Sequence, residues 1–134
     1  MIGLQTKLYN YERALHRLNE AIDALKLNTD DDITRDAVIQ RFEFTFELCW
    51  KTAKQYLEAT GIAEINSPKA VFRECYAQRL ISNEENWLLI LKDRNLTANV
   101  YNDGMAKEIA QRIIDCHAKE FKSLLTAIKK DVPS

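Results

Sequence analysis

The sequence predicts an all-α fold: an antiparallel up-down four-helix bundle with one additional short helix. Two observations lead to this prediction. Apolar residues recur at spacings of three and four along most of the 134 residues, which is the repeat of one face of an α-helix. No segment shows the sustained alternation of apolar and polar residues that is typical of a half-buried strand.

The first predicted helix carries a coiled-coil-like stripe, and charged residues occupy much of its other face. The stripe consists of Leu4, Leu8, Tyr11, Leu15, Leu18, Ile22 and Leu25. Residues 28–32, with the sequence NTDDD, interrupt this stripe. They offer aspartate N-caps and a negative first turn to the helix that follows.

The second predicted helix, about residues 32–60, is the most apolar segment and is apolar on two sides. Phe44 and Leu48 lie on roughly the opposite side from the main face, because a two-residue step turns about 200° on a helix. Such a helix is either central in the fold or shared with a second subunit. Gly61 is the expected C-terminal stop. The main face consists of Ile39, Phe42, Phe46, Cys49, Trp50, Ala53 and Leu57.

Three further helices are predicted after residue 66. Ser67 is expected to cap a short helix with Pro68 in its first turn. Ser82 and Glu85 form a capping-box pattern that opens the next helix, which carries Trp87, Leu88 and Leu91. The last helix is predicted to begin near residues 102–103, with a stripe of Met105, Ile109, Ile113, Cys116, Phe121, Leu124 and Ile128.

The length and composition indicate a single domain over residues 1–134. The net charge of −1 argues against a nucleic-acid binder that uses its whole surface, although a local basic groove remains compatible with it. Three widely spaced cysteines without a Cys-x-x-Cys pair are expected to be reduced core thiols. With no signal-like segment and no long apolar run, the chain is expected to be soluble and cytoplasmic.

The junction at residues 92–104, KDRNLTANVYNDG, is unusually rich in hydrogen-bonding side chains. Arg94 follows Trp87 by seven residues and therefore extends an apolar stripe, where its guanidinium needs a partner. Glu43 and Glu47, one turn apart on the second helix, are the nearest candidates by character. An Arg–Glu pair that only fixes helix register is one interpretation of this pattern, and a ligand-binding role for Arg94 is the other.

Long stretches of the sequence resemble the HEPN-domain family. The segments are RDAVIQRFEFTFELCWKTAKQYLE (35–58), SPKAVFRECY (67–76) and WLLILKDRNLTANVYN (87–102). More narrowly, the chain is similar to the nucleotidyltransferase substrate-binding proteins, which are partners of minimal nucleotidyltransferases. The likeness covers nearly the whole chain, so the resemblance implies a single HEPN-like helical-bundle domain that pairs as a homodimer.

The resemblance also assigns roles to individual residues. The family signature is Arg, a polar neighbour, His, and Tyr two residues after the His. Arg94, Asn95 and Tyr101 match the Arg, the polar neighbour and the Tyr, and Asn99 stands where the His is expected. Arg94, Asn99 and Tyr101 are thus the catalytic motif positions, and Arg94, Asn95 and Asn99 the expected substrate-binding residues. Tyr101 is the expected acceptor of AMP from the partner enzyme, and Glu47 is expected to support Arg94.

The absence of the motif histidine bears on catalysis. Many relatives act as metal-independent RNases and toxins of toxin–antitoxin pairs. Imidazole transfers protons near neutral pH, whereas the carboxamide of Asn99 does not titrate there. General acid–base catalysis is typically worth about 10²–10⁴-fold, so RNA cleavage is expected to be weak or absent. His16 and His117 lie on other predicted helices, and surface or core-edge packing is expected for His117.

Arg94 and Asn99 are five residues apart, about 140° around an ideal helix, so they converge only if the helix ends or bends between them. The first function hypothesis is a substrate- or nucleotide-binding subunit of a minimal nucleotidyltransferase, as in a toxin–antitoxin-like module. The second is a HEPN endoribonuclease, and the third is a purely structural bundle. The sequence shows no phosphate loop and no cluster with metal-ligand spacing, so no cofactor and no metal are expected. A nucleotide or RNA is the expected ligand.

Overall fold

The computed structural model describes the backbone of residues 2–99 and 102–132, and side chains within residues 3–98 and 102–132. All regular structure in these ranges is helical, which confirms the all-α prediction. No helix in the described ranges is long and apolar enough to cross a membrane. The helices are α1 (Ile2–Leu27), α2 (Asp32–Ala59), α3 (Pro68–Ala77), α4 (Glu84–Asn99), α5 (Asp103–Arg112), the π-helical segment η1 (Ile113–His117) and α6 (Ala118–Asp131).

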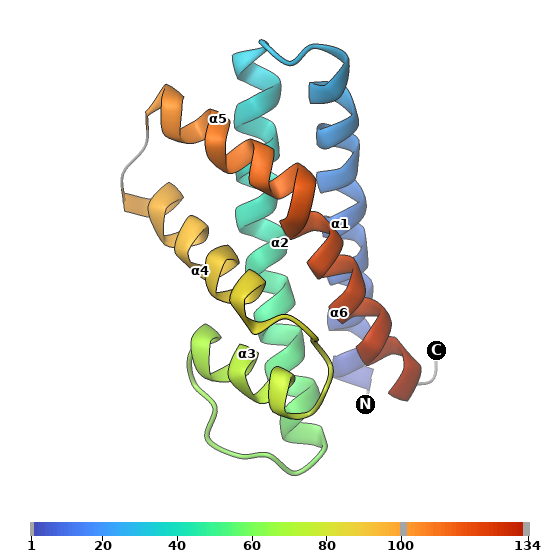
Figure 1. Cartoon of the computed structure of the whole chain (residues 1–134). Coiled ribbons are helices and arrows are strands. Elements are labelled where there is room, and N and C mark those ends of the chain that lie inside the picture. Colours follow the sequence, from blue (N-terminus) through green and yellow to red (C-terminus); the bar gives the residue numbers. More distant parts are fainter. Residues whose placement is uncertain (1, 100–101, 133–134) are drawn as a thin grey trace.

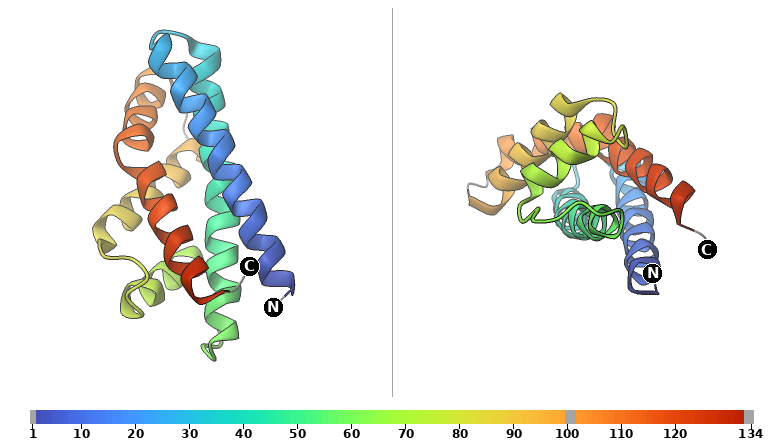
Figure 2. Two further views of the ribbon diagram at one scale, coloured as in Figure 1. Left: turned by 90° about the vertical axis from the view of Figure 1, so that its right-hand side faces the viewer. Right: turned by 90° about the horizontal axis from the view of Figure 1, so that it is seen from below.

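The two longest helices, α1 and α2, form an antiparallel hairpin that makes one layer of the molecule (Figure 1). The remaining helices form a second layer on one side of this hairpin (Figure 2). Within that layer α4 and α5 cross α2 obliquely rather than running along it (Figure 1). The helical bundle is therefore established, whereas the stricter up-down order of four helices stays a prediction.

The helix ends follow the turn chemistry of the sequence with one exception. The carboxylate of Asp31 accepts the backbone N–H of Ile33 at 3.2 Å, and the hydroxyl of Ser67 accepts that of Ala70 at 3.2 Å. Gly61 adopts φ 101°, a left-handed value that glycine tolerates without strain. These caps begin α2 and α3 and end α2 at the residues that the sequence predicts.

The exception is the start of α4. The predicted cap was Ser82 with Glu85, but the side chain of Asn83 accepts the backbone N–H of Asn86 at 3.0 Å. The helix therefore begins at Glu84. Asparagine and serine are about equally good N-caps. The sequence alone therefore does not decide which of the adjacent residues Ser82 and Asn83 caps α4.

Aromatic packing in the core fixes α4 against the other helices. The Trp87 ring lies 4.7 Å from that of Phe72 on α3 and 5.9 Å from that of Phe121 on α6, centroid to centroid. Phe121 in turn stacks on Phe42 of α2 at 5.8 Å. All four rings are fully buried, and burying each contributes about 1.5–3 kcal/mol. This packing sets the position of α4, and with it the position of Arg94.

The last predicted helix is interrupted, which the sequence analysis did not anticipate. The N–H of Ala118 bonds to the carbonyl of Ile113, five residues back, as in a π turn. One residue is thereby inserted into the helical repeat. As a result His117 is fully buried and Cys116 only partly so, the reverse of the predicted core-edge role for His117 and core role for Cys116.

Candidate functional site

Arg94 lies on the side of α4 that faces α2, and the two predicted glutamates hold it there. Its Nη1 is 3.1 Å from Oε2 of Glu43, and its Nη2 is 4.0 Å from Oε1 of Glu47. Glu43 and Glu47 are four residues apart and share one face of α2. Because the Arg94 side chain is 23% exposed, the guanidinium is partly shielded from water while one side remains accessible.

Neighbouring side chains hold both glutamates in place. The hydroxyl of Thr97, one turn after Arg94, lies 3.1 Å from Oε2 of Glu43 and 2.8 Å from the backbone carbonyl oxygen of Arg94, and it can donate its single hydrogen to either. Oε2 of Glu47 accepts from Nε1 of Trp50 at 3.3 Å and pairs with Nζ of Lys51 at 3.5 Å. The guanidinium is thus held by fixed acceptors, although its buried Nε–H has no hydrogen-bond partner among the described residues.

A groove of about 600 Å³ opens beside Arg94, and we call it the Arg94 groove. Its polar lining is mixed in charge, with three arginines against two glutamates, which leaves a small positive excess. The Nη1 of Arg41 donates to the backbone carbonyl of Arg17 at 2.8 Å, which fixes one of these cations. The lining residues are Ala14 and Arg17 of α1, Ala37, Gln40, Arg41, Glu43, Phe44 and Glu47 of α2, and Arg94 of α4.

The structure brings together only part of the predicted site. Glu47 lies 4.0 Å from Arg94, whereas Asn95 lines a different groove, on the outer face of α4. The helix continues through Asn99, so the backbone neither ends nor bends between Arg94 and Asn99 as their convergence requires. The side chain of Asn99 and all of Tyr101 lie outside the described residues, and their roles stay predictions.

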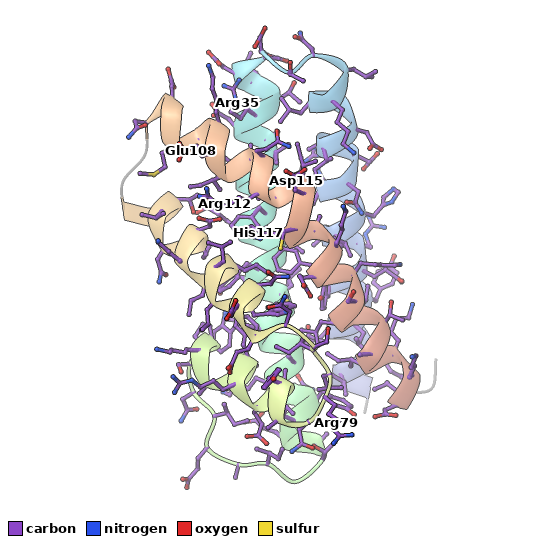
Figure 3. All side chains as sticks on the ribbon, in the orientation of Figure 1. Arg35, Arg79, Glu108, Arg112, Asp115 and His117 are labelled. Carbon is purple, nitrogen blue, oxygen red and sulfur yellow. The ribbon has the colours of Figure 1, made fainter. Side chains whose placement is uncertain are left out.

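A buried polar network that the sequence pattern did not predict is built on Asp93, next to Arg94 on α4. Asp93 is wholly buried, and its carboxylate accepts from Nε and Nη2 of Arg112 at 2.7 and 2.8 Å. Its Oδ2 also lies 2.7 Å from Nε2 of His117. Arg112 and His117 lie side by side where α5 passes into η1 (Figure 3). The network ties the helix that carries Arg94 to the π turn.

The electrostatics of this network follow from its hydrogen bonds. Burial opposes ionisation of Asp93, but the hydrogen bonds from His117 and Arg112, together with the Arg112 charge, outweigh burial and lower the pKa of Asp93. The hydrogen bond to Asp93 likewise raises the pKa of Arg112. The imidazole of His117 is fully buried, and its ring stacks on Phe42 at 5.5 Å. Its Nδ1 has no hydrogen-bond partner within the part of the chain that the structure describes.

Neither histidine replaces the missing motif histidine at Arg94. His117 is enclosed in the core, and His16 lies on the exposed face of α1 with Nε2 3.9 Å from Glu20. Neither lines the Arg94 groove. Among the described residues no group of three or more His, Cys, Asp or Glu side chains is arranged to hold a metal ion.

The family to which the chain belongs follows from comparison with known protein families. The family model for nucleotidyltransferase substrate-binding-like proteins matches residues 6–130. This chain belongs to the nucleotidyltransferase substrate-binding family. The resemblance drawn from the motif segments is therefore confirmed. No curated protein matches the sequence significantly.

Several solved structures share the fold of this chain. A Thermus thermophilus protein is 34% identical with a TM-score of 0.80, over 89% of this chain and 98% of that one. A Haemophilus influenzae protein, described as a nucleotidyltransferase substrate-binding domain, is 23% identical with a TM-score of 0.81, over 91% and 98%. A tri-AMPylated Shewanella oneidensis HEPN toxin, in complex with its MNT antitoxin, is 18% identical with a TM-score of 0.77, over 95% and 96%.

Proposed function

We propose that this chain is the substrate- or nucleotide-binding subunit of a minimal nucleotidyltransferase, as in a toxin–antitoxin-like module. The family match over residues 6–130 carries this proposal. The fold it shares with a toxin that is held in complex with an antitoxin supports it. Co-expression with a nucleotidyltransferase encoded beside the chain should yield a complex that elutes as one species in size-exclusion chromatography. If no such enzyme is encoded nearby and none is recovered in pull-downs, the proposal fails.

In this proposal the Arg94 groove is the binding site for a phosphate-bearing ligand. The guanidinium suits phosphate oxygens because its donors are planar and fixed, and Arg17 and Arg41 add positive charge in the same groove. Glu43 and Glu47 hold the guanidinium of Arg94 in place, and their negative charges also lower its attraction for anions. The groove is therefore expected to favour a ligand that offers donors to the glutamates as well as phosphate to Arg94.

Calorimetric titration with AMP and ATP tests this site. Arg94→Ala should weaken binding roughly 10- to 100-fold, because a hydrogen bond to a charged group is worth about 1.5–3 kcal/mol. Arg13→Ala is the matched control, since Arg13 is exposed on α1 and contacts Tyr9 rather than the groove. If Arg94→Ala and Arg13→Ala bind AMP and ATP with equal affinity, Arg94 is not part of the binding site.

A homodimer built on the open side of α2 is part of the proposal. The second layer of helices leaves this side of α2 uncovered (Figure 2), and Phe44 there is 62% exposed. Ile33, Ala37, Phe44 and Leu48 are spaced by four, seven and four residues, as in a helix–helix seam. Arg41, Glu47 and Lys51 beside them supply both signs of charge, which a self-complementary two-fold contact needs. We call these seven residues the α2 stripe. Ala37, Arg41, Phe44 and Glu47 also line the Arg94 groove, so a two-fold contact here would bring the Arg94 grooves of the two copies together.

RNA cleavage is the second candidate function, favoured by the fold shared with a HEPN toxin and opposed by Asn99. If it operates, the purified chain degrades RNA without metal, and Arg94→Ala abolishes the activity. If the chain is inactive but Asn99→His creates cleavage, the site is intact and lacks only its proton-transfer group. If neither the wild type nor Asn99→His cleaves RNA, the RNase function is excluded and the binding function is the remaining proposal.

Tyr101 as AMP acceptor is a separate part of the proposal. In such a reaction the phenol oxygen attacks the α-phosphorus of ATP, pyrophosphate leaves, and the phenol proton passes to a base of the partner enzyme. Incubation with the nucleotidyltransferase and ATP should add one adenylyl mass for each AMP transferred. Tyr101→Phe should remove that shift, whereas an unchanged shift in the variant places the modification elsewhere.

A further inference from the structure

The outer face of α3 and α4 carries a second groove, separate from the Arg94 groove. It has a volume of about 490 Å³ and shares no lining residue with the Arg94 groove. We call it the α4 groove. Its lining consists of Lys69 at the start of α3 and Leu88, Leu91, Lys92, Asn95 and Leu96 of α4.

The floor of the α4 groove is apolar. Leu88 is 38% exposed, and Leu91 and Leu96 are half-buried on either side of the same helix face. Three leucines that line one groove leave apolar area in water, and a partner gains about 25 cal/mol for each Å² of it that it covers. The floor is therefore suited to apolar side chains of another protein.

The rim of the α4 groove carries only positive charge. Lys69 and Lys92 are both exposed, and the lining includes no carboxylate. Within the described residues neither lysine takes part in an ion pair, whereas Lys51, Lys54 and Lys129 each pair with a glutamate. The chain as a whole has a net charge of −1, so the two unpaired lysines do not reflect a generally basic protein.

The charges decide which kind of partner fits. If two copies of the chain met groove to groove, Lys69 and Lys92 of each would face like charges, which disfavours the contact. The α2 stripe has both signs of charge and is the surface suited to a second copy. The α4 groove instead calls for a different chain with apolar side chains flanked by carboxylates.

We propose that the α4 groove is the docking site of the nucleotidyltransferase, through an apolar segment whose carboxylates pair with Lys69 and Lys92. This inference rests on the proposed function and assigns a surface to it. Asn95, a motif position that does not line the Arg94 groove, thereby gains a place in the contact with the enzyme.

The position of the groove along α4 agrees with the proposed transfer of AMP. Asn95, which lines the groove, stands six residues before Tyr101 in the sequence. An enzyme seated in the α4 groove would therefore contact the helix that precedes the proposed AMP acceptor.

Charge reversal tests the docking site. The double variant Lys69→Glu and Lys92→Glu, titrated calorimetrically with the purified nucleotidyltransferase, should bind at least tenfold more weakly than the wild type. Its affinity should also vary less with salt, because the steering charges are gone. The variant is expected to fold, since both side chains are exposed and a glutamate in the first turn of α3 is favourable. Lys69→Gln with Lys92→Gln should give an intermediate loss.

The matched control is Lys122→Glu with Lys130→Glu. It changes the net charge equally, on exposed positions of α6 that line neither the α4 groove nor the Arg94 groove. The control should bind like the wild type, and equal weakening in both double variants would reduce the effect to overall charge and overturn the docking site. Binding by the Lys69 and Lys92 variant at wild-type strength would overturn the docking site and leave the proposed function standing. If the wild type binds no nucleotidyltransferase, both fail together.

Discussion

Replacing Asp93 by asparagine should destabilise the protein strongly, because the carboxylate is the shared acceptor of a buried network. Asparagine keeps one acceptor oxygen, but its amide N–H groups then face donors on Arg112 or His117, which contact the carboxylate at 2.7–2.8 Å. Removing one partner of a buried ion pair costs about 3–5 kcal/mol. The Arg112 side chain is 34% exposed and can regain water, so we expect a loss of about 2–3 kcal/mol.

Urea unfolding at neutral pH measures this loss of unfolding free energy directly. Thermal unfolding gives a second measure: for a domain of this size, 1 kcal/mol corresponds to roughly 3–5 °C in Tm, so Tm should fall by about 6–15 °C. Asp115→Asn is the matched control, because Asp115 is exposed in the same π-helical segment and binds only the amide of Gln111 among the described side chains. The control should change stability by less than about 0.5 kcal/mol. If Asp93→Asn is as stable as the control, the network does not hold α4 as described.

Three further outcomes follow from the structure. Because the pKa of Asp93 is lowered in the folded state, its ionised form contributes to stability above the unfolded pKa near 3.9, and this contribution is lost as the pH falls through the folded pKa. The unfolding free energy should therefore fall less steeply with decreasing pH in Asp93→Asn than in the wild type. Parallel curves of unfolding free energy against pH would contradict this. Phe44→Ser should shift sedimentation from dimer to monomer while changing monomer stability by less than about 1 kcal/mol, because the ring is 62% exposed; a variant that stays dimeric would exclude the α2 stripe. Alkylation at pH 8 followed by mass spectrometry should label Cys116 first, because Cys116 is only partly buried whereas Cys49 and Cys75 are fully buried. Burial raises the pKa of all three thiols, and that of Cys75 to about 12. Early labelling of Cys49 would show that the core opens readily.

The partners of Arg94 were predictable because the reasoning used helical spacing alone. An arginine seven residues after a buried tryptophan has to find a carboxylate, and Glu43 and Glu47 are the two acidic residues in the middle of the most apolar helix. The same reasoning would have found Asp93, which follows the buried Ile90 by three residues and so shares a helix face with it. A carboxylate at such a position signals buried partners.

The partners of Asp93 were not predictable with the usual helical repeat. Arg112 and His117 are five residues apart, which places them about 140° apart on an α-helix. The π turn changes this relation, because its hydrogen bonds join residues five apart. A weak signal was present, since Ile109, Ile113, His117 and Phe121 are all fully buried at a constant spacing of four. Each such step overshoots a full α-helical turn by about 40°, and the inserted residue absorbs the drift.

In the proposed assembly, the number of enzyme molecules bound per dimer follows from the separate positions of the α2 stripe and the α4 groove. If the dimer closes across the α2 stripe, the α4 groove of each copy stays open, and a symmetric pair offers two equivalent docking sites. Two enzyme molecules would then attach per dimer, and a tethered or dimeric enzyme would gain avidity only where its span matches the distance between the grooves. Mass photometry of the reconstituted complex should accordingly count equal numbers of the two chains.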